Sequence, residues 1–243
     1  MRTPRIYQAA SIAVGTEVEL SDDAANHVGR VLRLREGAEL TLFCGDNHEY
    51  QATIISASKK NVRVKIALSH LNNVESPLAI HLAQGISRGE RMDFVLQKSV
   101  ELGVTSITPL FTERCTVKLQ GERLTKKQEQ WQRIVISACE QSGRNYVPEV
   151  RPALTLTEWL AQAPLGQRLM LEPTAADSLA TLKPNTAFEI LIGPEGGFSD
   201  QEVSLCHLHQ CQGIQMGPRI LRTETAALAA ITALQCQFGD LAG

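Results

Sequence analysis

Hydrophobic and polar positions alternate in short runs over the first third of the chain, which is the period of strands with one buried face. Three such runs, at residues 38–44, 49–57 and 62–68, are separated by short polar turns. They predict an antiparallel meander. Residues 5–8 and 16–21 are shorter strand candidates.

A short helix is expected over residues 21–34, before the meander. N-capping residue types open this stretch, and apolar residues follow at helical spacing: Ala25, Val28, Val31 and Leu32. Strands and helix together predict a small β-barrel with one helix, and we assign it to residues 1–72. The polar stretch "NNVESP" that follows reads as a linker.

The hydrophobic pattern changes after the linker to strands that alternate with helices. Buried-strand patterns occupy residues 78–84, 104–111, 167–172, 188–193 and 214–217. Helical patterns occupy residues 89–103, 125–143, 157–162, 199–210 and 223–238. Thr125 with Gln128, and Ser199 with Glu202, have capping-box spacing. The helix over 89–103 has one buried face, formed by Met92, Val95, Leu96, Ser99 and Val100. This alternation predicts an α/β domain over residues 73–243 with a mostly parallel, covered sheet.

Composition adds few constraints to this picture. Hydrophobic residues make up 43% of the chain and aromatic ones 5%, so aliphatic side chains must fill most of the core. The apolar runs are too short for a spanning helix, and "MRTPRIYQAA" is not a secretory signal, so a cytoplasmic protein is expected. Six widely spaced cysteines indicate reduced thiols. In "CHLHQC" the helical phase spreads the possible ligands around the axis, so no metal site is predicted.

Charge is distributed unevenly around a net value of −2. Residues 1–70 carry 9 Lys+Arg against 8 Asp+Glu, residues 84–151 carry 11 against 8, and residues 152–243 carry 4 against 9. A polyanion such as RNA would therefore meet the N-terminal and middle parts of the chain.

Three strand ends carry unusual loops: "LEPTA" at 171–175, "GPEGGFS" at 193–199 and "GPRILRTET" at 217–225. In an open α/β sheet ligands bind beyond the carboxyl ends of the strands, and glycines allow close approach to the backbone. The spacing matches neither common phosphate-binding pattern, and Glu195 favours a ligand with hydroxyls, an amine or a positive charge. The alternative is that these loops are only tight connections with glycine where φ is positive.

The last helix carries a face of small side chains, formed by Ala226, Ala227, Ala229, Ala230 and Ala233. Such a face allows another backbone to approach closely. Packing on the sheet and a homodimer interface both explain it.

Four separated motifs resemble those of one known family. They are "RMDFVLQKSVELGV", "ACEQSGRNYVPEV", "LIGPEGGFSDQE" and "MGPRILRTETAALAAI". Together, and over essentially the whole chain, they resemble the ribosomal RNA small-subunit methyltransferase E family of the SPOUT superfamily. The resemblance implies a PUA-like N-terminal domain, a C-terminal trefoil knot and a homodimer. It also implies methyl transfer from S-adenosylmethionine (SAM) to N3 of a uridine in 16S rRNA of the small subunit.

The resemblance also assigns roles to residues of this chain. The cofactor-binding set is Leu171, Glu172, Gly193, Glu195, Gly196, Met216, Gly217, Leu221, Arg222, Thr223 and Ala226. Adenine would meet backbone groups near Met216 and Leu221, with Leu171 as an apolar wall. Uracil N3–H is a weak acid, so catalysis needs a base or a cation that stabilises the anion, and Arg222 is the candidate cation. The alternative for Arg222 is a structural salt bridge with Glu224 or with an acidic residue of the partner chain. Thr223 and Thr225 either orient the loop or the cofactor, or only cap the last helix.

RNA contacts are expected from basic residues of the front and middle of the chain. This set is Arg5, Arg30, Arg33, Lys59, Lys60, Arg88, Arg91, Arg114 and Arg144. Arg88 and Arg91 in "GISRGER" carry more weight, because cations are disfavoured before a helix N-terminus unless an anion binds there. Each arginine is otherwise a solvated surface charge. Two other functions stay open: a non-catalytic RNA-binding or assembly factor, and a methyltransferase acting on transfer RNA or on a ribose hydroxyl.

Overall fold

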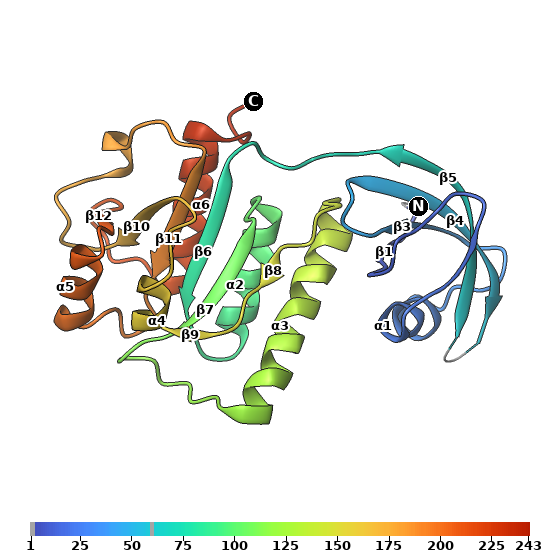
Figure 1. Cartoon of the computed structure of the whole chain (residues 1–243), viewed down its shortest axis with the longest axis horizontal. Coiled ribbons are helices and arrows are strands. Elements are labelled where there is room, and N and C mark those ends of the chain that lie inside the picture. The colour runs from blue at the N-terminus through green and yellow to red at the C-terminus, as the bar shows by residue number, and fades with distance from the viewer. Residues whose placement is uncertain (1–2, 59–60) are drawn as a thin grey trace. The chain divides into compact units, whose positions relative to one another are not determined.

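The computed structural model describes residues 3–58 and 61–243, and the chain forms two compact units (Figure 1). The first unit takes the described residues up to Glu75 together with residues 139–147. The second unit takes residues 76–138 and 148–243. The sequence-based division at residue 72 therefore differs from the observed one chiefly in the short segment 139–147, which joins the first unit.

The first unit is built on a five-stranded sheet in the order β1-β3-β4-β5-β2. Its strands are β1 Arg5–Tyr7, β2 Glu17–Glu19, β3 Glu39–Phe43, β4 His48–Ala57 and β5 Val62–Leu71. The predicted meander is confirmed, because β3, β4 and β5 pair antiparallel in sequence order. Among the described residues the outer strands β1 and β2 are not paired with each other, so the sheet is open where a barrel was expected.

The helical segment of this unit is shorter than its sequence pattern predicts. Helix α1 spans Asp22–Asn26 with Ser21 as its N-cap, and a π-helical turn follows over His27–Val31. Ala25 and Val28 are buried in the core, but Val31 is 64% and Leu32 37% exposed. The four residues that the sequence places at helical spacing therefore do not share one buried face, because a π turn takes an extra residue and shifts the phase.

The second unit is built on a seven-stranded sheet in which, among the described residues, all paired strands run parallel. Its order is β12-β10-β11-β6-β7-β8, with β9 also paired to β7. The strands are β6 Ala79–Gly85, β7 Ser106–Phe111, β8 Glu149–Val150, β9 Leu154–Thr155, β10 Gln167–Leu171, β11 Ala187–Ile192 and β12 Gln212–Ile214. The predicted mostly parallel sheet is thus confirmed, while β8 and β9 are too short to give a periodic signal.

The helices of this unit follow the predicted pattern closely. They are α2 Glu90–Glu101, α3 Gly121–Ser142, α4 Leu156–Leu160, α5 Asp200–Leu208 and α6 Thr223–Phe238, with a 3-10 turn η2 at Leu179–Thr181. The buried face of α2 is the predicted one, and both capping-box bonds between Ser199 and Glu202 form. The capping box at Thr125 is wrong, because α3 begins at Gly121 and the Thr125 hydroxyl donates to the Gly121 carbonyl.

Helices cover both faces of the sheet. On one face α6 contacts β6, β11 and α2, and Phe238 stacks on Phe188 at 5.5 Å between ring centroids. Ala226, Ala227 and Ala230 are buried there, so packing on the sheet accounts for these three small side chains, whereas Ala229 and Ala233 are partly exposed. On the other face α4 and α5 enclose a cluster that includes Trp159, Met170 and Cys206. Because these strands run parallel, the carboxyl ends of β6, β10, β11 and β12 lie at the same edge of the sheet.

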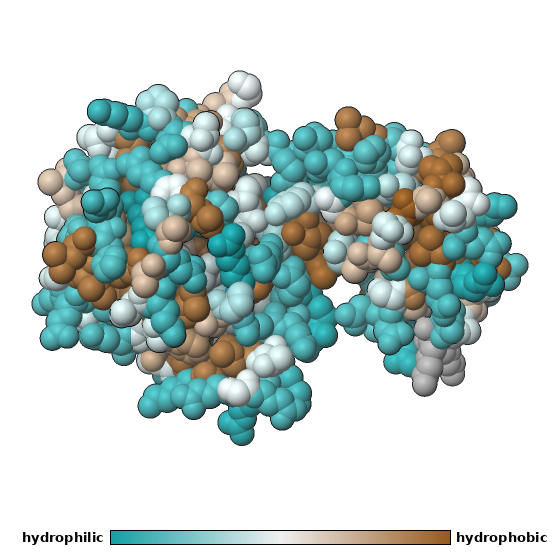
Figure 2. All heavy atoms as spheres, viewed as in Figure 1, coloured by the Kyte–Doolittle hydropathy of each residue, from teal (hydrophilic) through white to brown (hydrophobic). Residues whose placement is uncertain are grey.

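The surface and the cysteines fit the composition. The face seen in Figure 2 is predominantly hydrophilic, with hydrophobic residues in small separate patches. No helix within the described ranges has the length and apolar character needed to cross a bilayer. All six cysteines are free thiols, and the described residues hold no cluster of His, Cys, Asp and Glu suited to a metal ion.

Candidate active site

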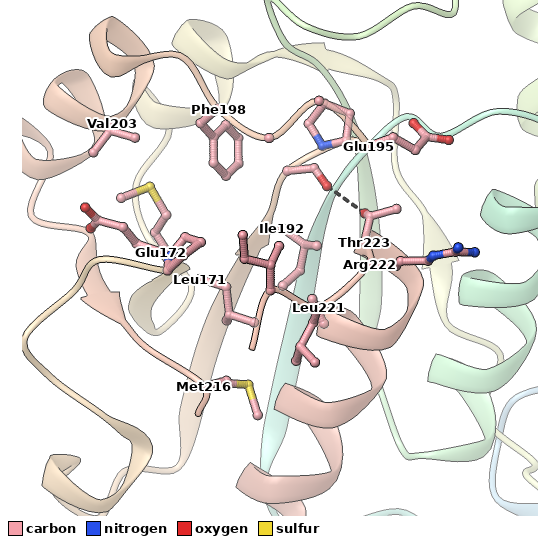
Figure 3. A pocket seen from close by; sticks show the side chains of 18 of the residues that line it. Leu171, Glu172, Ile192, Glu195, Phe198, Val203, Met216, Leu221, Arg222 and Thr223 are labelled. Atoms are coloured by element: carbon pink, nitrogen blue, oxygen red, sulfur yellow. Dashed lines mark hydrogen bonds between the residues drawn. The ribbon is translucent and has the colours of Figure 1, made fainter. Parts of the chain in front are cut away.

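The loops that follow β10, β11 and β12 enclose a cavity of about 890 Å³ at the carboxyl edge of the sheet (Figure 3). Every residue that the sequence assigned to cofactor binding lines this cavity. They are Leu171, Glu172, Gly193, Glu195, Gly196, Met216, Gly217, Leu221, Arg222, Thr223 and Ala226. The three loops, far apart in sequence, are thus brought around one space, whose volume is within the usual range of roughly 300–1,000 Å³ for small-molecule sites.

One part of the cavity is apolar. The side chains of Leu171, Ile192, Met216 and Leu221 gather at the strand ends, and Phe198 lies nearby (Figure 3). Leu171 and Ile192 are the last residues of β10 and β11, so the rigid sheet fixes their positions. This wall suits a flat apolar group.

The loop after β11 is a tight turn with little side-chain bulk. Gly197 donates its N–H to the Pro194 carbonyl at 2.9 Å and has φ +65°. A Cβ on Gly196 would lie 2.9 Å from Arg114 Cβ, and one on Gly193 would lie 3.3 Å from the Gly197 backbone. Close packing within the protein is therefore a sufficient reason for glycine at positions 193 and 196. The turn still exposes its backbone to the cavity.

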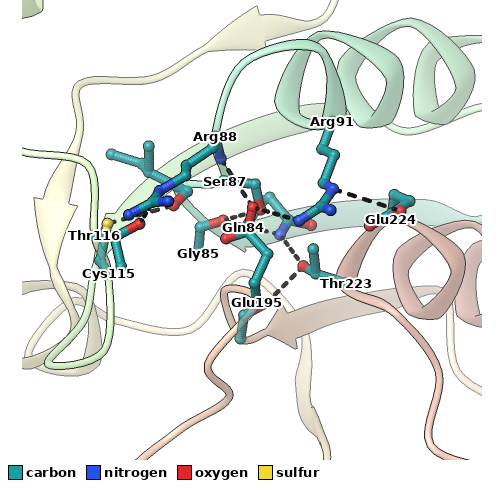
Figure 4. A network of polar contacts seen from close by, with 12 residues as sticks. Gln84, Gly85, Ser87, Arg88, Arg91, Cys115, Thr116, Glu195, Thr223 and Glu224 are labelled. Atoms are coloured by element: carbon teal, nitrogen blue, oxygen red, sulfur yellow. Dashed lines mark hydrogen bonds and ion pairs between the residues drawn. The ribbon is translucent and has the colours of Figure 1, made fainter.

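Glu195 extends from this turn into a network of polar contacts (Figure 4). Its Oε1 accepts from the backbone N–H of Arg88 at 3.0 Å and from the Arg91 guanidinium at 3.2 Å. Partial burial raises the pKa of Glu195, but these hydrogen bonds outweigh it and hold the pKa below its ordinary value. The carboxylate is therefore ionised and engaged with the protein.

The two arginines of "GISRGER" are engaged with the same network. Arg91 lies in the first turn of α2 and not before the helix, and its Nε is 4.0 Å from Glu224 Oε1. The Nε of Arg88 donates to the Thr116 hydroxyl at 2.7 Å. Acceptors within the protein thus bind part of both guanidinium groups, for which the sequence predicted an external anion. Both arginines nevertheless remain exposed.

Arg222 and Thr223 begin the last helix and differ in their surroundings. Arg222 is the N-cap residue of α6 and is exposed, and it makes no ion pair in the described part of the chain. The expected alternative, a salt bridge from Arg222 to Glu224, is not formed, because Glu224 faces Arg91. Thr223 is buried and donates its hydroxyl to the Gly193 carbonyl at 2.6 Å, so it orients the loop after β11.

Three residues near the site were missed by sequence analysis. Gln84 donates to the Thr223 hydroxyl at 2.9 Å, and Gly85 packs against Pro194. Gly213 makes room for Glu172, since a Cβ there would lie 2.5 Å from Glu172 Oε2. A polar glutamine at the end of an apolar strand run was the available signal for Gln84.

The predicted RNA-binding residues fall into three groups. Arg5 and Arg144 are 8% and 4% exposed and form ion pairs with Glu49 and Glu75, so neither presents its charge to a polyanion. Both are corrected to structural roles. Arg30, Arg33, Arg88, Arg91 and Arg114 are exposed, and Arg114 donates to the Gly196 carbonyl at 3.1 Å. Lys59 and Lys60 lie outside the described residues.

Comparisons with known proteins agree with this arrangement. Residues 74–235 match the family model of an RNA methyltransferase domain, and residues 20–67 match that of an RNA methyltransferase PUA domain. The ribosomal RNA small subunit methyltransferase E of Buchnera aphidicola is 38% identical over 99% of this chain and 98% of its own length.

Two solved structures share the fold over nearly their whole length. One is the ribosomal RNA small subunit methyltransferase E of Neisseria gonorrhoeae bound to S-adenosyl methionine, with a TM-score of 0.94 and 44% identity over 98% of this chain and 99% of that one. The other is a methyltransferase of Legionella pneumophila in complex with SAM, with a TM-score of 0.96 and 49% identity over 99% of this chain and 100% of that one. Family models and full-length relatives together place this chain in the ribosomal RNA small subunit methyltransferase E family, so it is an rRNA methyltransferase.

Proposed function

We propose that this enzyme transfers a methyl group from SAM to N3 of a uridine in 16S rRNA of the small ribosomal subunit. Family membership supports the reaction class and the rRNA substrate, and two similar proteins were crystallised with SAM. The observation that carries the proposal is the single cavity formed by the loops after β10, β11 and β12. The choice of N3 rests on the resemblance to the family.

The residues around the cavity fit SAM. The apolar wall of Leu171, Met216 and Leu221 receives adenine, and the turn at Gly193 and Gly196 offers backbone groups to the ribose and methionine parts. Glu172, Gly217, Thr223 and Ala226 complete the binding set. Glu195 holds the turn in place through Arg88 and Arg91. When bound, the cofactor supplies an electrophilic methyl group on a sulfonium.

Arg222 is the proposed catalytic residue. Loss of the N3 proton leaves negative charge on O2 and O4 of uracil, and a preorganised cation stabilises that charge. Arg222 lines the cavity, is exposed, and makes no internal ion pair in the described part of the chain. Its guanidinium is therefore available to an oxygen edge of uracil, which it binds in a forked geometry.

The exposed arginines supply phosphate contacts. Arg30 and Arg33 of the first unit, and Arg88, Arg91 and Arg114 of the second, contact the RNA backbone. Arg33 has φ +55°, which is uncommon for a non-glycine residue and is often associated with function. Lys59 and Lys60 join this set on sequence grounds alone.

Three further features belong to the proposal. A C-terminal trefoil knot is supported by the strand order, because the chain passes from β11 across β10 to β12 and returns to α6, which contacts β6 and β11. A homodimer is supported by Ile220, a large apolar side chain at the cavity that is 86% exposed. A cytoplasmic location follows from the rRNA substrate.

The proposal is tested with purified protein, methyl-labelled SAM, and small subunits or 16S rRNA from cells that lack this enzyme. We expect one labelled methyl group per rRNA, at N3 of a single uridine, as mapped by nuclease digestion and mass spectrometry. Label on a ribose hydroxyl of the rRNA, or label on transfer RNA offered in a parallel reaction, would favour a related methyltransferase. SAM binding without any transfer would favour a non-catalytic RNA-binding factor.

A further inference from the structure

Gln84 is a fully buried polar side chain at the end of the central strand β6, with 0% exposure. Its neighbours Leu82, Ala83 and Ile86 are buried and apolar. A primary amide in such a place is unfavourable unless hydrogen bonds compensate for lost water. A buried polar residue that breaks the apolar pattern is a candidate for a functional role.

The Gln84 amide starts a directed chain of hydrogen bonds (Figure 4). Its Nε2 donates to the Thr223 hydroxyl oxygen at 2.9 Å and to the Gly85 carbonyl at 3.0 Å. Because the Gly85 carbonyl can only accept, the NH2 group of Gln84, and not its amide oxygen, faces Gly85 and Thr223. Thr223 accepts from Gln84, so its hydroxyl hydrogen is directed to the Gly193 carbonyl at 2.6 Å. The chain joins the end of β6, the start of α6 and the turn after β11.

The next residue of β6 reinforces this connection. Gly85 lies so close to the turn that a Cβ would be 2.5 Å from Pro194 N and 2.9 Å from the Gly193 carbonyl carbon. In the sheet Gln84 pairs with Ile192, the last residue of β11. The last two residues of β6 therefore support the turn at Gly193 and Pro194 from the sheet, and neither places a side chain in the cavity.

We propose that Gln84 is a positioning residue for cofactor binding, acting through Thr223 and Gly193. It sets the distance between the turn after β11 and the start of α6, which are two of the three loops that enclose the cavity. Gln84 itself is absent from the described residues that line the cavity. The inference rests on the proposed function, because it takes SAM as the ligand.

The first experiment compares Gln84→Met with Gln235→Met. Gln235 is a matched control, because it is a glutamine of the same unit with 0% exposure. Its amide oxygen accepts a hydrogen bond of 2.7 Å from the Ser76 hydroxyl, and Gln235 does not line the cavity. Isothermal titration with SAM and with S-adenosylhomocysteine gives Kd, and thermal unfolding gives Tm. We expect both variants to lower Tm, whereas only Gln84→Met raises Kd, by about tenfold for one or two lost hydrogen bonds.

The second experiment uses Gln84→Glu, whose ability to donate depends on pH. A protonated carboxyl at position 84 donates to Thr223, while a carboxylate only accepts and draws the Thr223 hydroxyl away from Gly193. Burial raises the pKa of a carboxyl, so the titration falls within a measurable window of about pH 5 to pH 9. We expect the Kd ratio of variant to parent to approach one at low pH and to grow as pH rises.

The outcomes separate the inference from the function on which it rests. If the parent binds SAM and Gln84→Met binds it equally well, the inference is overturned and the proposed function stands. A Gln235→Met variant that loses affinity as much as Gln84→Met, or a pH-independent ratio for Gln84→Glu, would also overturn it, since general destabilisation then explains the loss. A parent that does not bind SAM overturns both.

Discussion

The guanidinium of Arg91 donates to the carboxylate of Glu195 at 3.2 Å, which joins the first turn of α2 to the turn after β11. The same carboxylate oxygen accepts from Arg88 N–H at 3.0 Å, so two donors, one just before α2 and one in its first turn, meet at one oxygen atom. The contact links the arginine segment 85–91 to the cavity wall. Because Glu195 also lines the cavity, a substitution there changes both the cavity wall and the contact with α2.

Glu195→Gln keeps the shape of the side chain and removes its charge. We expect weaker SAM binding by a few fold, because the charge-assisted bonds from Arg88 and Arg91 become neutral ones. The pKa of Glu195 is lowered in the folded state, so its contribution to stability is present above the unfolded pKa and is lost as pH falls through the folded pKa. The stability difference between parent and variant, measured by urea unfolding, should therefore shrink as the solution is acidified. A difference that grows with acidification would contradict the assignment.

Arg222→Ala tests the catalytic cation. We expect the rate of methyl transfer to fall by about 10²–10³, as for the loss of one group that stabilises developing charge, while the Kd for SAM changes little. Single-turnover kinetics with saturating SAM and RNA measure the rate, and titration measures Kd. Arg222→Lys serves as the control that keeps the charge and loses the forked geometry, with an intermediate rate expected. Equal losses in rate and affinity would reassign Arg222 to the cofactor.

Gly85→Ala tests the close contact between β6 and the turn at Gly193 and Pro194. The added methyl group would lie 2.5 Å from Pro194 N, so the turn must move. We expect a loss of about 1–3 kcal/mol in the free energy of unfolding, as for overpacked cores, together with weaker SAM binding. Gly29→Ala is the control, because among the described residues its Cβ would meet Ser58 O alone, at 3.4 Å. If Gly85→Ala binds SAM as the parent does, the turn is not held by this contact.

The predictable parts of the fold are those with long, regular patterns. The buried face of α2 and the span of α6 were predicted because each follows from helical spacing over more than three turns. The phase of residues 27–32 was missed because a π turn has no local sequence signature. Strands β8 and β9 have two residues each, which is shorter than any period.

The site was predictable as a set of loops but not as a network of bonds. Glycine and proline at strand ends located the three loops, and the parallel sheet brought them together. Which groups pair was beyond the sequence, because the partners of Arg5, Arg91 and Arg144 come from distant segments. The same limit applied to Gln84, whose role depends on a contact 139 residues away along the chain.

A buried ion pair supports the same sheet on its other face. Arg168 donates to Glu189 at 2.7 Å, to the carbonyls of Trp159 and Leu160 at the end of α4, and to the carbonyl of Gln162 just after it. Arg168→Met should cost about 3–5 kcal/mol in the free energy of unfolding, because it leaves Glu189 buried without its partner. The double variant with Glu189→Leu should recover part of this loss, but not all, since the carbonyls stay unpaired. Chemical denaturation of the single and double variants measures the coupling, and a fully additive cycle would contradict it.

Arg33→Gln and Arg5→Met separate RNA binding from folding in the first unit. Arg33 is exposed, so its replacement should weaken binding to 16S rRNA and reduce the slope of log K against log salt by about one, with no change in Tm. Arg5 is buried beside Glu49 and donates to Asn145 at 2.7 Å, so its replacement should lower Tm. Its folded fraction should keep the parent's salt slope, because a buried guanidinium displaces no counterion. Filter binding at several salt concentrations gives both slopes. A reduced slope for Arg5→Met would return that residue to the RNA-binding set.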